Sequence, residues 1–568
     1  MRLLLIVLVV LAGLVVVVRR GRARHLALLR SEWGRPVVRT RRMDAIAASY
    51  RSRIADLDAA DFLDDRTWDD LDLDEVFAAL DRTESTLGQH GLYYRIRMAP
   101  AAAHLDAFEA LVARLADDSA ARERAQLALS RLHDPHGYDL WWLARRDGSE
   151  MPRWAVAFPV LTLATVAMAV LVLFWPPLLP GLIGVLLVNV IARFLSDRRS
   201  IAVAAAFRQI APVIATGQAL QFLGGDGPLV GSLRADAHAL RGLKTIARWI
   251  SGDPFMLPIG SGAVVMLIND IVHTIYEYLN LFLLLDATGA YLGSESLRAR
   301  TPALLRLMAA AGEIDAALSV ASFRAGRSDW TTPRLAAPGA TAVFRDVCHP
   351  LVPGAVPNTI VLAPGRGAII TGSNMSGKTT FLRTIGVAAI MAETLNTCLA
   401  AEYDAPVFLV RSCIGRADDL ISGKSYYIVE VEALLRLVAA AATGTAHLFL
   451  LDEIFRGTNA VERIAAGHAV LRELTGAPER PSAHVVLAAT HDGEIVDLVA
   501  DSYAAFHFGD ATEQGSLTFD HRLREGRATT RNAIALLRLH GAPQDLIARA
   551  LACAADLDRQ RGTTVQAT

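Results

Sequence analysis

Residues 372–379 read Gly372-Ser373-Asn374-Met375-Ser376-Gly377-Lys378-Thr379 and fit the pattern G-x-x-x-x-G-K-[ST] at every fixed position. The apolar residues 368–370 before them predict a buried strand, and apolar residues at helical spacing over 380–395 predict a helix. Strand, glycine-rich loop and helix in this order form a phosphate cradle, because the loop N–H groups and the helix N-terminus both favour an anion. The stretch therefore predicts an α/β domain of the P-loop NTPase type.

The same pattern assigns roles to single side chains. We expect Lys378 to reach the outer phosphates of ATP and the Thr379 hydroxyl to bind Mg²⁺. ATP and Mg²⁺ are therefore the expected ligand and cofactor. The residues expected to contact the nucleotide are Gly372, Ser373, Asn374, Met375, Ser376, Gly377, Lys378, Thr379 and Thr380.

Two later apolar segments end in polar residues that suit the other half of such a site. Residues 447–451 lead into Asp452, expected to hold Mg²⁺ through water, and Glu453, expected to orient or deprotonate the attacking water. Residues 485–489 lead into His491, which we expect to sense the γ-phosphate. Purely structural roles are the alternatives, and the preceding P-loop argues against them.

A second group of glycines and serines lies at residues 415–425, ahead of an expected helix over 426–441. Such a helix start is suited to an anion. Because the chain already has one phosphate cradle, the second site suggests a γ-phosphate presented by another subunit.

The composition of the 568 residues indicates several domains and a membrane component. Lys and Arg total 57 against 58 Asp and Glu, so the overall charge does not indicate a nucleic-acid binder. The hydrophobic share of 53% exceeds that of ordinary soluble domains. The four cysteines, at 348, 398, 413 and 553, have no metal-binding spacing and indicate a reducing compartment.

Apolar segments near the N-terminus and in the first half of the chain predict membrane contact. Residues 3–18 are an apolar run followed at once by arginines, which favours an uncleaved anchor with a cytosolic flank over a signal peptide. The arginines either attract anionic lipid headgroups or simply form the flank of the anchor. Residues 154–174 and 178–195, separated by Trp175-Pro176-Pro177, predict a transmembrane hairpin; a buried helical hairpin is the alternative.

Between and after these segments the pattern is helical. Residues 44–150 are expected to form soluble helices, with amphipathic spacing over 61–80, and residues 303–320 continue the helical pattern. Residues 262–287 are also apolar, but Asp270 and Glu277 would each cost about 2.5–3.5 kcal/mol at the centre of a membrane helix. We therefore expect a long helix there, packed in a soluble core.

Taken together, the motifs resemble the MutS group of DNA mismatch-repair ATPases. The motifs that carry the resemblance are, in order, TGSNMSGKTT, GRADDLISGKSYYIVEVE, LLDEIFRGTN and ATH, within residues 340–557. Helices over 44–335 resemble the core and lever of that family more weakly. The resemblance implies that Ser425 contacts the γ-phosphate bound to a partner and that residues 531–557 form a helix-turn-helix joining two subunits. It also implies that the segment around Val356 leads to the adenine pocket.

The chain departs from the family pattern in several places. An anchor and a short basic stretch stand where the mismatch-reading domain would lie, and the hairpin at 154–195 stands where the core would extend into a DNA clamp. Phe455 replaces a usual glycine after the acidic pair, and Val356 replaces a usual aromatic residue. Mismatch recognition is therefore not expected.

These observations predict an all-α core and lever with a membrane anchor and hairpin, followed by an ABC-like, MutS-type P-loop domain. The expected function is that of a multi-pass membrane ATPase, homodimeric, with its ATPase domain on the cytosolic side of a bacterial-type inner membrane. A DNA-structure-binding clamp tethered to the membrane is the alternative, and an ABC transporter subunit is disfavoured because the spans are few. DNA and further protein partners stay open. The expected segments are anchor 1–24, helical core 25–153, hairpin 154–195, core and lever 196–335, ATPase domain 336–525 and dimerisation segment 526–568.

Overall fold

A computed structural model describes residues 2–565 apart from several gaps. The longer gaps are 145–152, 196–202, 225–230, 248–262, 416–425 and 528–533, and shorter ones are 38, 40, 59–61, 99–101, 204–206, 245–246, 364, 374, 457, 478–479, 482, 514–515, 535–536 and 538–540. The chain forms two compact units. The helical unit comprises Met1–Asp61, Phe77–Arg97 and Ala101–Ser328, and the α/β unit comprises Phe62–Val76, Met98–Pro100 and Asp329–Thr568.

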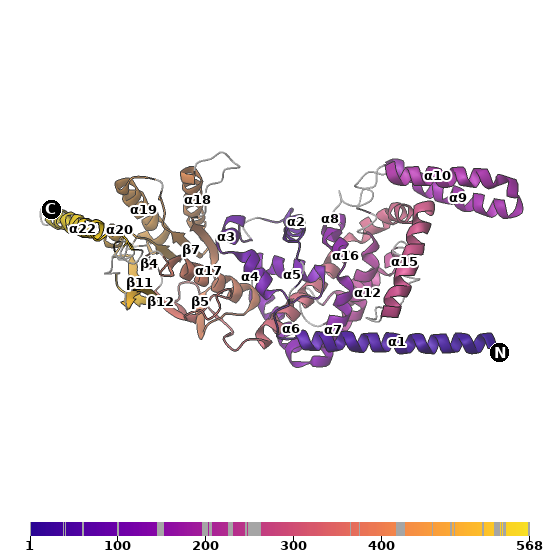
Figure 1. The fold of residues 1–568 in the computed structure, drawn as a ribbon, viewed down its shortest axis with the longest axis horizontal. Helices are drawn as coiled ribbons and strands as arrows, with labels where there is room; N and C mark the ends of the chain where they lie inside the picture. Colours follow the sequence, from indigo (N-terminus) through magenta and orange to yellow (C-terminus); the bar gives the residue numbers. More distant parts are fainter. Residues whose placement is uncertain are drawn as a thin grey trace. The chain divides into compact units, whose positions relative to one another are not determined.

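The α/β unit is built on a six-stranded sheet with the order β12-β11-β4-β10-β7-β6 (Figure 1). Its strands are β4 (Gly367–Thr371), β6 (Leu409–Ile414), β7 (His447–Asp452), β10 (Val485–Ala489), β11 (Tyr503–Glu513) and β12 (Ser516–Glu525). Neighbouring strands from β11 to β6 pair in parallel, and β11 and β12 pair antiparallel. Every residue of β4 and β10 is buried, as expected of parallel strands covered on both faces. The strands expected at 368–370, 447–451 and 485–489 are confirmed.

Further elements complete this unit. The helices are α17 (Lys378–Leu395), α18 (Tyr426–Ala441), α19 (Ala460–Thr475), α20 (Gly493–Leu498) and α22 (Gln544–Val565). A four-stranded sheet, in the order β1-β5-β2-β3, consists of β1 (Arg334–Ala336), β5 (Glu402–Pro406), β2 (Ala342–Val347) and β3 (Asn358–Leu362). A small pair, β8 (Gly476–Ala477) and β9 (Arg480–Pro481), follows α19.

An N-terminal segment also belongs to the α/β unit. Helix α3 (Asp65–Asp70) lies on the edge strand β6, where the Asp70 carboxylate accepts hydrogen bonds from Ser412 Oγ at 2.8 Å and the Ile414 N–H at 2.9 Å. These contacts cover part of the edge of the sheet, which would otherwise expose unpaired backbone groups. The expected division of the chain at residue 336 stays a prediction; the structure begins the last part of this unit at Asp329 and adds residues 62–76 to it.

The helical unit is organised around α16 (Leu285–Ala325), a helix of 41 residues. The other described helices of this unit are α1 (Arg2–Glu32), α2 (Met43–Ile54), α4 (Leu73–Leu80, which begins in the α/β unit), α5 (Thr86–Arg97), α6 (Ala102–Asp117), α7 (Ser119–Leu129), α8 (Leu140–Ala144), α9 (Ala157–Phe174), α10 (Leu179–Leu195), α12 (Ile210–Leu220), α13 (Leu233–Ala239) and α15 (Ala263–Leu283). The helix expected at 303–320 is confirmed as part of α16.

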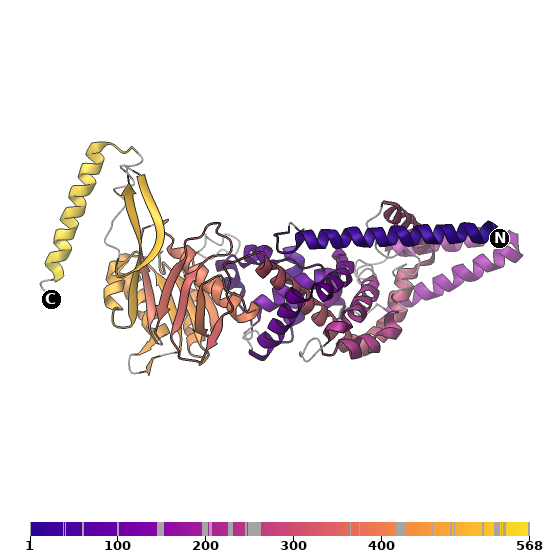
Figure 2. The same cartoon turned by 90° about the horizontal axis from the view of Figure 1, so that it is seen from below.

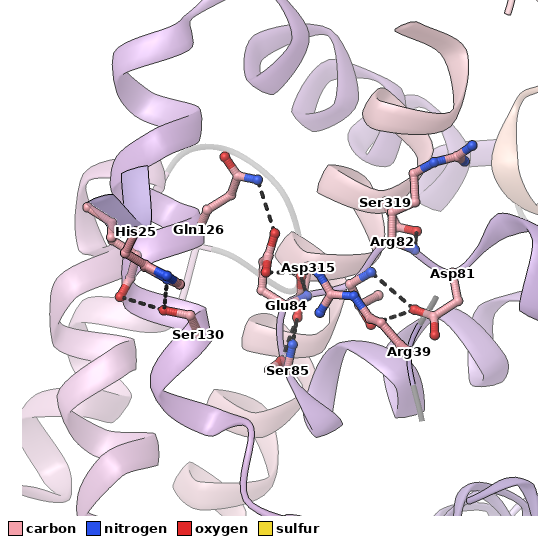
Figure 3. A network of polar contacts seen from close by, with 12 residues as sticks. His25, Arg39, Asp81, Arg82, Glu84, Ser85, Gln126, Ser130, Asp315 and Ser319 are labelled. Atoms are coloured by element: carbon pink, nitrogen blue, oxygen red, sulfur yellow. Dashed lines mark hydrogen bonds and ion pairs between the residues drawn. The ribbon is translucent and has the colours of Figure 1, made fainter. Parts of the chain in front are cut away.

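Polar contacts lock α16 to the start of α5 (Figure 3). The buried Asp315 carboxylate accepts hydrogen bonds from the backbone N–H groups of Glu84 and Ser85, both at 2.8 Å, and from the Ser85 hydroxyl at 2.5 Å. One turn further along α16, Ser319 accepts from the Arg82 N–H and donates to the Leu80 carbonyl, each at 2.8 Å. Asp315 thus satisfies backbone donors that precede the first turn of α5.

Helices α9 and α10 form an antiparallel hairpin with a short 3₁₀ turn, Pro176–Leu178, between them. The two segments Arg153–Phe174 and Pro176–Phe194 are long and apolar enough to cross a membrane. Only 11% and 6% of their most apolar 18-residue stretches are buried within the protein. In Figures 1 and 2 the N-terminal half of α1 extends from the helical unit toward the same end as this hairpin. Its other half is tied to the unit, for example by the ion pair between Arg30 and Glu123.

Helix α15 corrects one expectation. The sequence predicted a helix packed in a soluble core at 262–287, and a helix is present. However, Ile271, Ile275 and Tyr278 are 51%, 55% and 63% exposed. The expectation was wrong because two charges within a segment argue against a full membrane crossing but do not show where its apolar side chains point.

Where α16 crosses α5, the backbones approach so closely that only glycine fits. A Cβ at Gly312 would lie 2.7 Å from the Leu87 carbonyl oxygen, and a Cβ at Gly91 would lie 2.4 Å from the Gly312 oxygen. Both neighbours are backbone atoms, which cannot rotate away. This crossing therefore depends on the two glycines.

We predict that Gly312→Ala destabilises the helical unit by roughly 1–3 kcal/mol, the usual cost of overpacking. Thermal unfolding of the purified protein, followed by circular dichroism, should show a lower midpoint. Gly242→Ala is the matched control, because Gly242 also has helical backbone and a Cβ there meets no atom within 4 Å. Equal midpoints for the two variants would contradict the close crossing.

Candidate active site

The glycine-rich loop lies between β4 and α17, as the sequence predicted. Gly377, just before α17, has φ +116°, which disfavours any residue with a side chain. A Cβ at Gly372 would lie 2.8 Å from Ser376 Oγ and 3.0 Å from the Phe508 carbonyl oxygen. These positions therefore need glycine for the loop to close at the start of the helix. Asn374 lies outside the described residues.

Lys378 lies over the loop that precedes it. Its ammonium donates hydrogen bonds to the carbonyl oxygens of Gly372 and Ser373, at 2.9 and 3.0 Å. Burial lowers the pKa of Lys378, and the nearby carboxylates of Glu453 and Asp452 oppose this shift. A cation is thus held where the loop would receive phosphate.

Thr379 and Asp452 lie together at the end of β7. The Thr379 hydroxyl donates to Asp452 Oδ2 at 2.6 Å. Asp452 Oδ1 is buried and has no hydrogen-bond partner among the residues that the structure describes. Burial raises the pKa of Asp452, and the hydrogen bond from Thr379 opposes the rise. A buried carboxylate oxygen without a donor, beside a hydroxyl, fits the oxygen ligands that Mg²⁺ prefers.

Glu453 is held by two cationic or hydrogen-bonding neighbours. His491 Nε2 lies 2.9 Å from Glu453 Oε1, and Arg456 forms an ion pair with the other oxygen. Burial disfavours the charge of Glu453, but the hydrogen bonds from His491 and Arg456 outweigh it and lower the pKa of the carboxyl to about 2. A carboxylate with so low a pKa accepts a proton poorly, so in this conformation it is suited to orienting a water molecule.

His491 is placed between Glu453 and the P-loop. Its Nε2 is also 3.3 Å from Lys378 Nζ, so the nitrogen donates to Glu453 or accepts from Lys378 according to its tautomer. The adjacent Asp492 forms two hydrogen bonds with Arg463 of α19, at 2.8 and 2.9 Å. These contacts fix the segment that carries His491.

Beside the loop lies a cavity of about 550 Å³, a size suited to a nucleotide. Lys378, Thr379 and Glu453 line one part of it, and Val356 lines another. The structure therefore brings the expected phosphate residues and the expected adenine-side residue to one cavity. Ser425, the residue expected to contact a partner's nucleotide, lies outside the described residues.

Sequence reasoning missed the role of His521 in this cavity, and it placed Asn358 only in the segment expected to lead to the adenine pocket. Asn358 donates from Nδ2 to the His521 carbonyl at 2.9 Å and accepts from the Leu523 N–H at 2.7 Å, which ties β3 to β12. His521 Nδ1 in turn lies 3.0 Å from the Ser376 carbonyl of the P-loop. No local pattern marks His521, because it lies 163 residues from Asn358 in the chain.

Phe455 explains one departure from the family pattern. Its φ is +61°, a conformation that glycine adopts without strain, and its side chain is buried in the core. The Phe455 N–H donates to Glu430 of α18 at 2.7 Å. Packing and this hydrogen bond therefore hold a backbone conformation that a glycine would adopt freely.

Comparisons with known proteins agree with this geometry. Residues 368–558 match the family model for MutS domain V. The chain is 33% identical over 208 residues to the DNA mismatch repair protein MutS of Streptococcus mutans, which covers 36% of this chain and 24% of that protein. It is 34% identical over 200 residues to the protein of the same name from Streptococcus equi subsp. equi, over 34% of this chain and 23% of that protein. The chain thus matches about a quarter of the length of these relatives, and residues 368–558 match MutS domain V, which is an ABC-like ATPase domain.

Proposed function

We propose that this protein is a membrane-anchored, MutS-like ATPase that binds and hydrolyses ATP with Mg²⁺ to drive a conformational change. One observation carries the proposal. Lys378, His491 and the Asp452–Glu453 pair come together at the ends of adjacent parallel strands, beside a cavity of nucleotide size. The combination of cation, metal ligand and water-orienting carboxylate is that of phosphoryl transfer to water.

The roles follow from the contacts. Lys378 and the N–H groups of the loop bind the phosphates, while Thr379 and Asp452 hold Mg²⁺, which neutralises phosphate charge when bound. Glu453 orients the attacking water, and His491 holds Glu453 in place. A bound γ-phosphate competes with Glu453 for Arg456, which also lines the cavity. Release of Arg456 raises the pKa of Glu453 and lets it accept the proton of the water.

The membrane part of the proposal rests on the helical unit. The α9–α10 hairpin exposes large apolar side chains along both helices, including Leu163, Leu173 and Phe174 at 70%, 79% and 84% exposure. Such exposure is costly in water and favourable in lipid. The expected anchor in α1 extends toward the same end as the hairpin. Arginines flank both segments, and this flanking charge supports an ATPase domain in the cytosol of a bacterial-type cell.

The first prediction from the proposed function concerns the chemistry of ATP hydrolysis. Lys378→Ala should abolish tight ATP binding, since the loop loses its cation. Glu453→Gln should still bind ATP but hydrolyse it at least ~10²-fold more slowly, as expected when general-base help is lost. Equilibrium binding of a fluorescent ATP analogue and single-turnover hydrolysis separate the two effects.

Glu473→Gln provides the matched control, because Glu473 is an exposed glutamate of α19 that does not line the cavity. It should leave both binding and turnover unchanged. Normal turnover by Glu453→Gln would show that the acidic pair has been misassigned.

The second prediction concerns topology. Trp175 is 66% exposed at the tip of the hairpin, so a Trp175→Cys variant should react with an impermeant maleimide on intact cells. The native Cys553 is exposed on the C-terminal helix and should react only after lysis. Labelling of Cys553 on intact cells would refute a cytosolic ATPase domain.

A third prediction concerns assembly. We propose a homodimer in which Ser425 of one subunit contacts the γ-phosphate held by Lys378 of the other. Mixing Ser425→Ala with Lys378→Ala should then restore part of the ATPase activity, because one of the two shared sites in a mixed dimer keeps both residues. Differentially tagged mixed dimers that are no more active than either variant alone would rule out shared sites.

A further inference from the structure

Helix α15 has the reverse of the pattern expected for a helix on a water-soluble protein. Its buried side carries Tyr276 and Asn280, which are 4% and 2% exposed. Its exposed side carries large apolar residues: Leu267, Ile271, Ile275, Tyr278, Leu279 and Phe282. A helix facing water normally buries its apolar side and exposes its polar side. The part of the exposed surface of α15 that carries these apolar residues is therefore suited to an apolar surrounding.

The exposed residues divide into two stripes. At about 100° per residue, the six apolar residues fall within an arc of about 120°. Asp270, His273, Thr274 and the partly exposed Glu277 fall on a neighbouring arc of about 100°. An apolar stripe next to a polar stripe is the arrangement of a helix lying at the boundary between lipid and water.

The C-terminal end of α15 packs on the base of the α9–α10 hairpin (Figure 1). Leu284, with φ +51°, separates α15 from α16, and its side chain packs with Ala155 and Phe158. Thr162 of α9 donates to the Leu283 carbonyl at 2.7 Å, and Asn189 of α10 donates to the Phe282 carbonyl. We call the segment formed by α15, Leu284 and the start of α16 the elbow.

The buried side chains of Tyr276, Asn280 and Asp286 in the elbow hydrogen-bond to one another. The buried Asp286 accepts hydrogen bonds from Tyr276 at 2.8 Å and Asn280 at 2.7 Å and pairs with Arg208. Arg208 also pairs with Glu277 at 2.9 Å. Internal satisfaction of this kind is what a segment needs where no water can reach it.

The contacts also give the depth of the elbow along the hairpin. Thr162 and Asn189 lie about 8–9 Å from the base ends of α9 and α10 at 1.5 Å per residue. One leaflet of the hydrocarbon core is about 15 Å thick. Arg193, four residues nearer the base of the hairpin than Asn189, lines a common cavity with His273 and Glu277, on the side where the charged headgroups would lie. The depth of Thr162 and Asn189 along the hairpin and the position of the charged cavity therefore agree with an elbow that reaches part of the way into one leaflet.

We propose that the elbow enters the leaflet on the ATPase side of the membrane and that the apolar stripe of α15 contacts lipid acyl chains. The proposal rests on the membrane hairpin of the proposed function and extends it. The hairpin is then one part of a larger membrane-contacting surface, to which α15 contributes without crossing the bilayer.

Site-directed spin labelling of the full-length protein in liposomes tests the inference. Cys348 and Cys553 are replaced by serine, and the buried Cys398 and Cys413 are kept. Single cysteines are introduced by Ile275→Cys and Phe282→Cys on the apolar stripe and by Asp270→Cys on the polar stripe. Leu171→Cys on α9 reports on the hairpin itself. ATP turnover, to which none of these positions contributes, checks that each labelled variant is folded.

At positions 275 and 282 we expect the collision rate with oxygen to exceed that with a water-soluble nickel complex several-fold, as at position 171. Position 270 should show the opposite ratio. Nickel access at 275 and 282 with a lipid-like ratio at 171 would overturn the elbow inference and leave the hairpin standing. Nickel access at 171 would instead refute the membrane hairpin. Labels at 275 and 282 that reach neither reagent would show protein contact, such as a second copy, in place of lipid.

Discussion

Parallel pairing of β4, β10 and β7 is the constraint on which the site depends. Beyond the strand ends the pairing continues, since the Thr490 N–H donates to the Ile370 carbonyl at 3.0 Å and the Glu453 N–H to the Ala489 carbonyl at 2.9 Å. Three chain segments far apart in sequence therefore end at the same edge. The side chains that follow, Lys378, Glu453 and His491, meet because their backbones are aligned, and the polar contacts among them refine an arrangement that the sheet already imposes.

The proposed mechanism links ATP binding to the protonation state of Glu453. Before phosphate is bound, Glu453 is held by Arg456 and His491, and its pKa of about 2 makes it a poor proton acceptor. In the proposed mechanism, the charge of ATP draws Arg456 away and the carboxylate gains basicity. In this mechanism Glu453 becomes a proton acceptor only when the phosphate that it acts on is bound, so proton transfer without substrate is limited.

The sequence predicted the parts of the structure that local patterns control. The P-loop with its flanking strand and helix, and the strands ending at Asp452 and before His491, follow from motifs whose residues are close in the chain. The pairing of Asn358 with His521 could not be predicted, because it depends on the approach of two distant strands. For α15 the error had another cause. Counting its charges indicated that the helix does not cross a membrane, but only the tertiary packing shows that Tyr276 and Asn280 face inward while Ile275 faces outward.

In the proposed function, helix α16 is the chain segment that leads from the elbow toward the start of the last part of the α/β unit at Asp329. It starts at the elbow beside the hairpin and extends for 41 residues, about 60 Å, to Ala325, three residues before the helical unit ends at Ser328. The close crossing at Gly312 and the hydrogen bonds of Asp315 fix it to α5 along the way. A continuous helix fixed in this way is suited to passing a displacement from one end to the other, although Pro302 lies within it. Coupling of nucleotide state to the membrane would then require only that ATP favour one of two positions of α16.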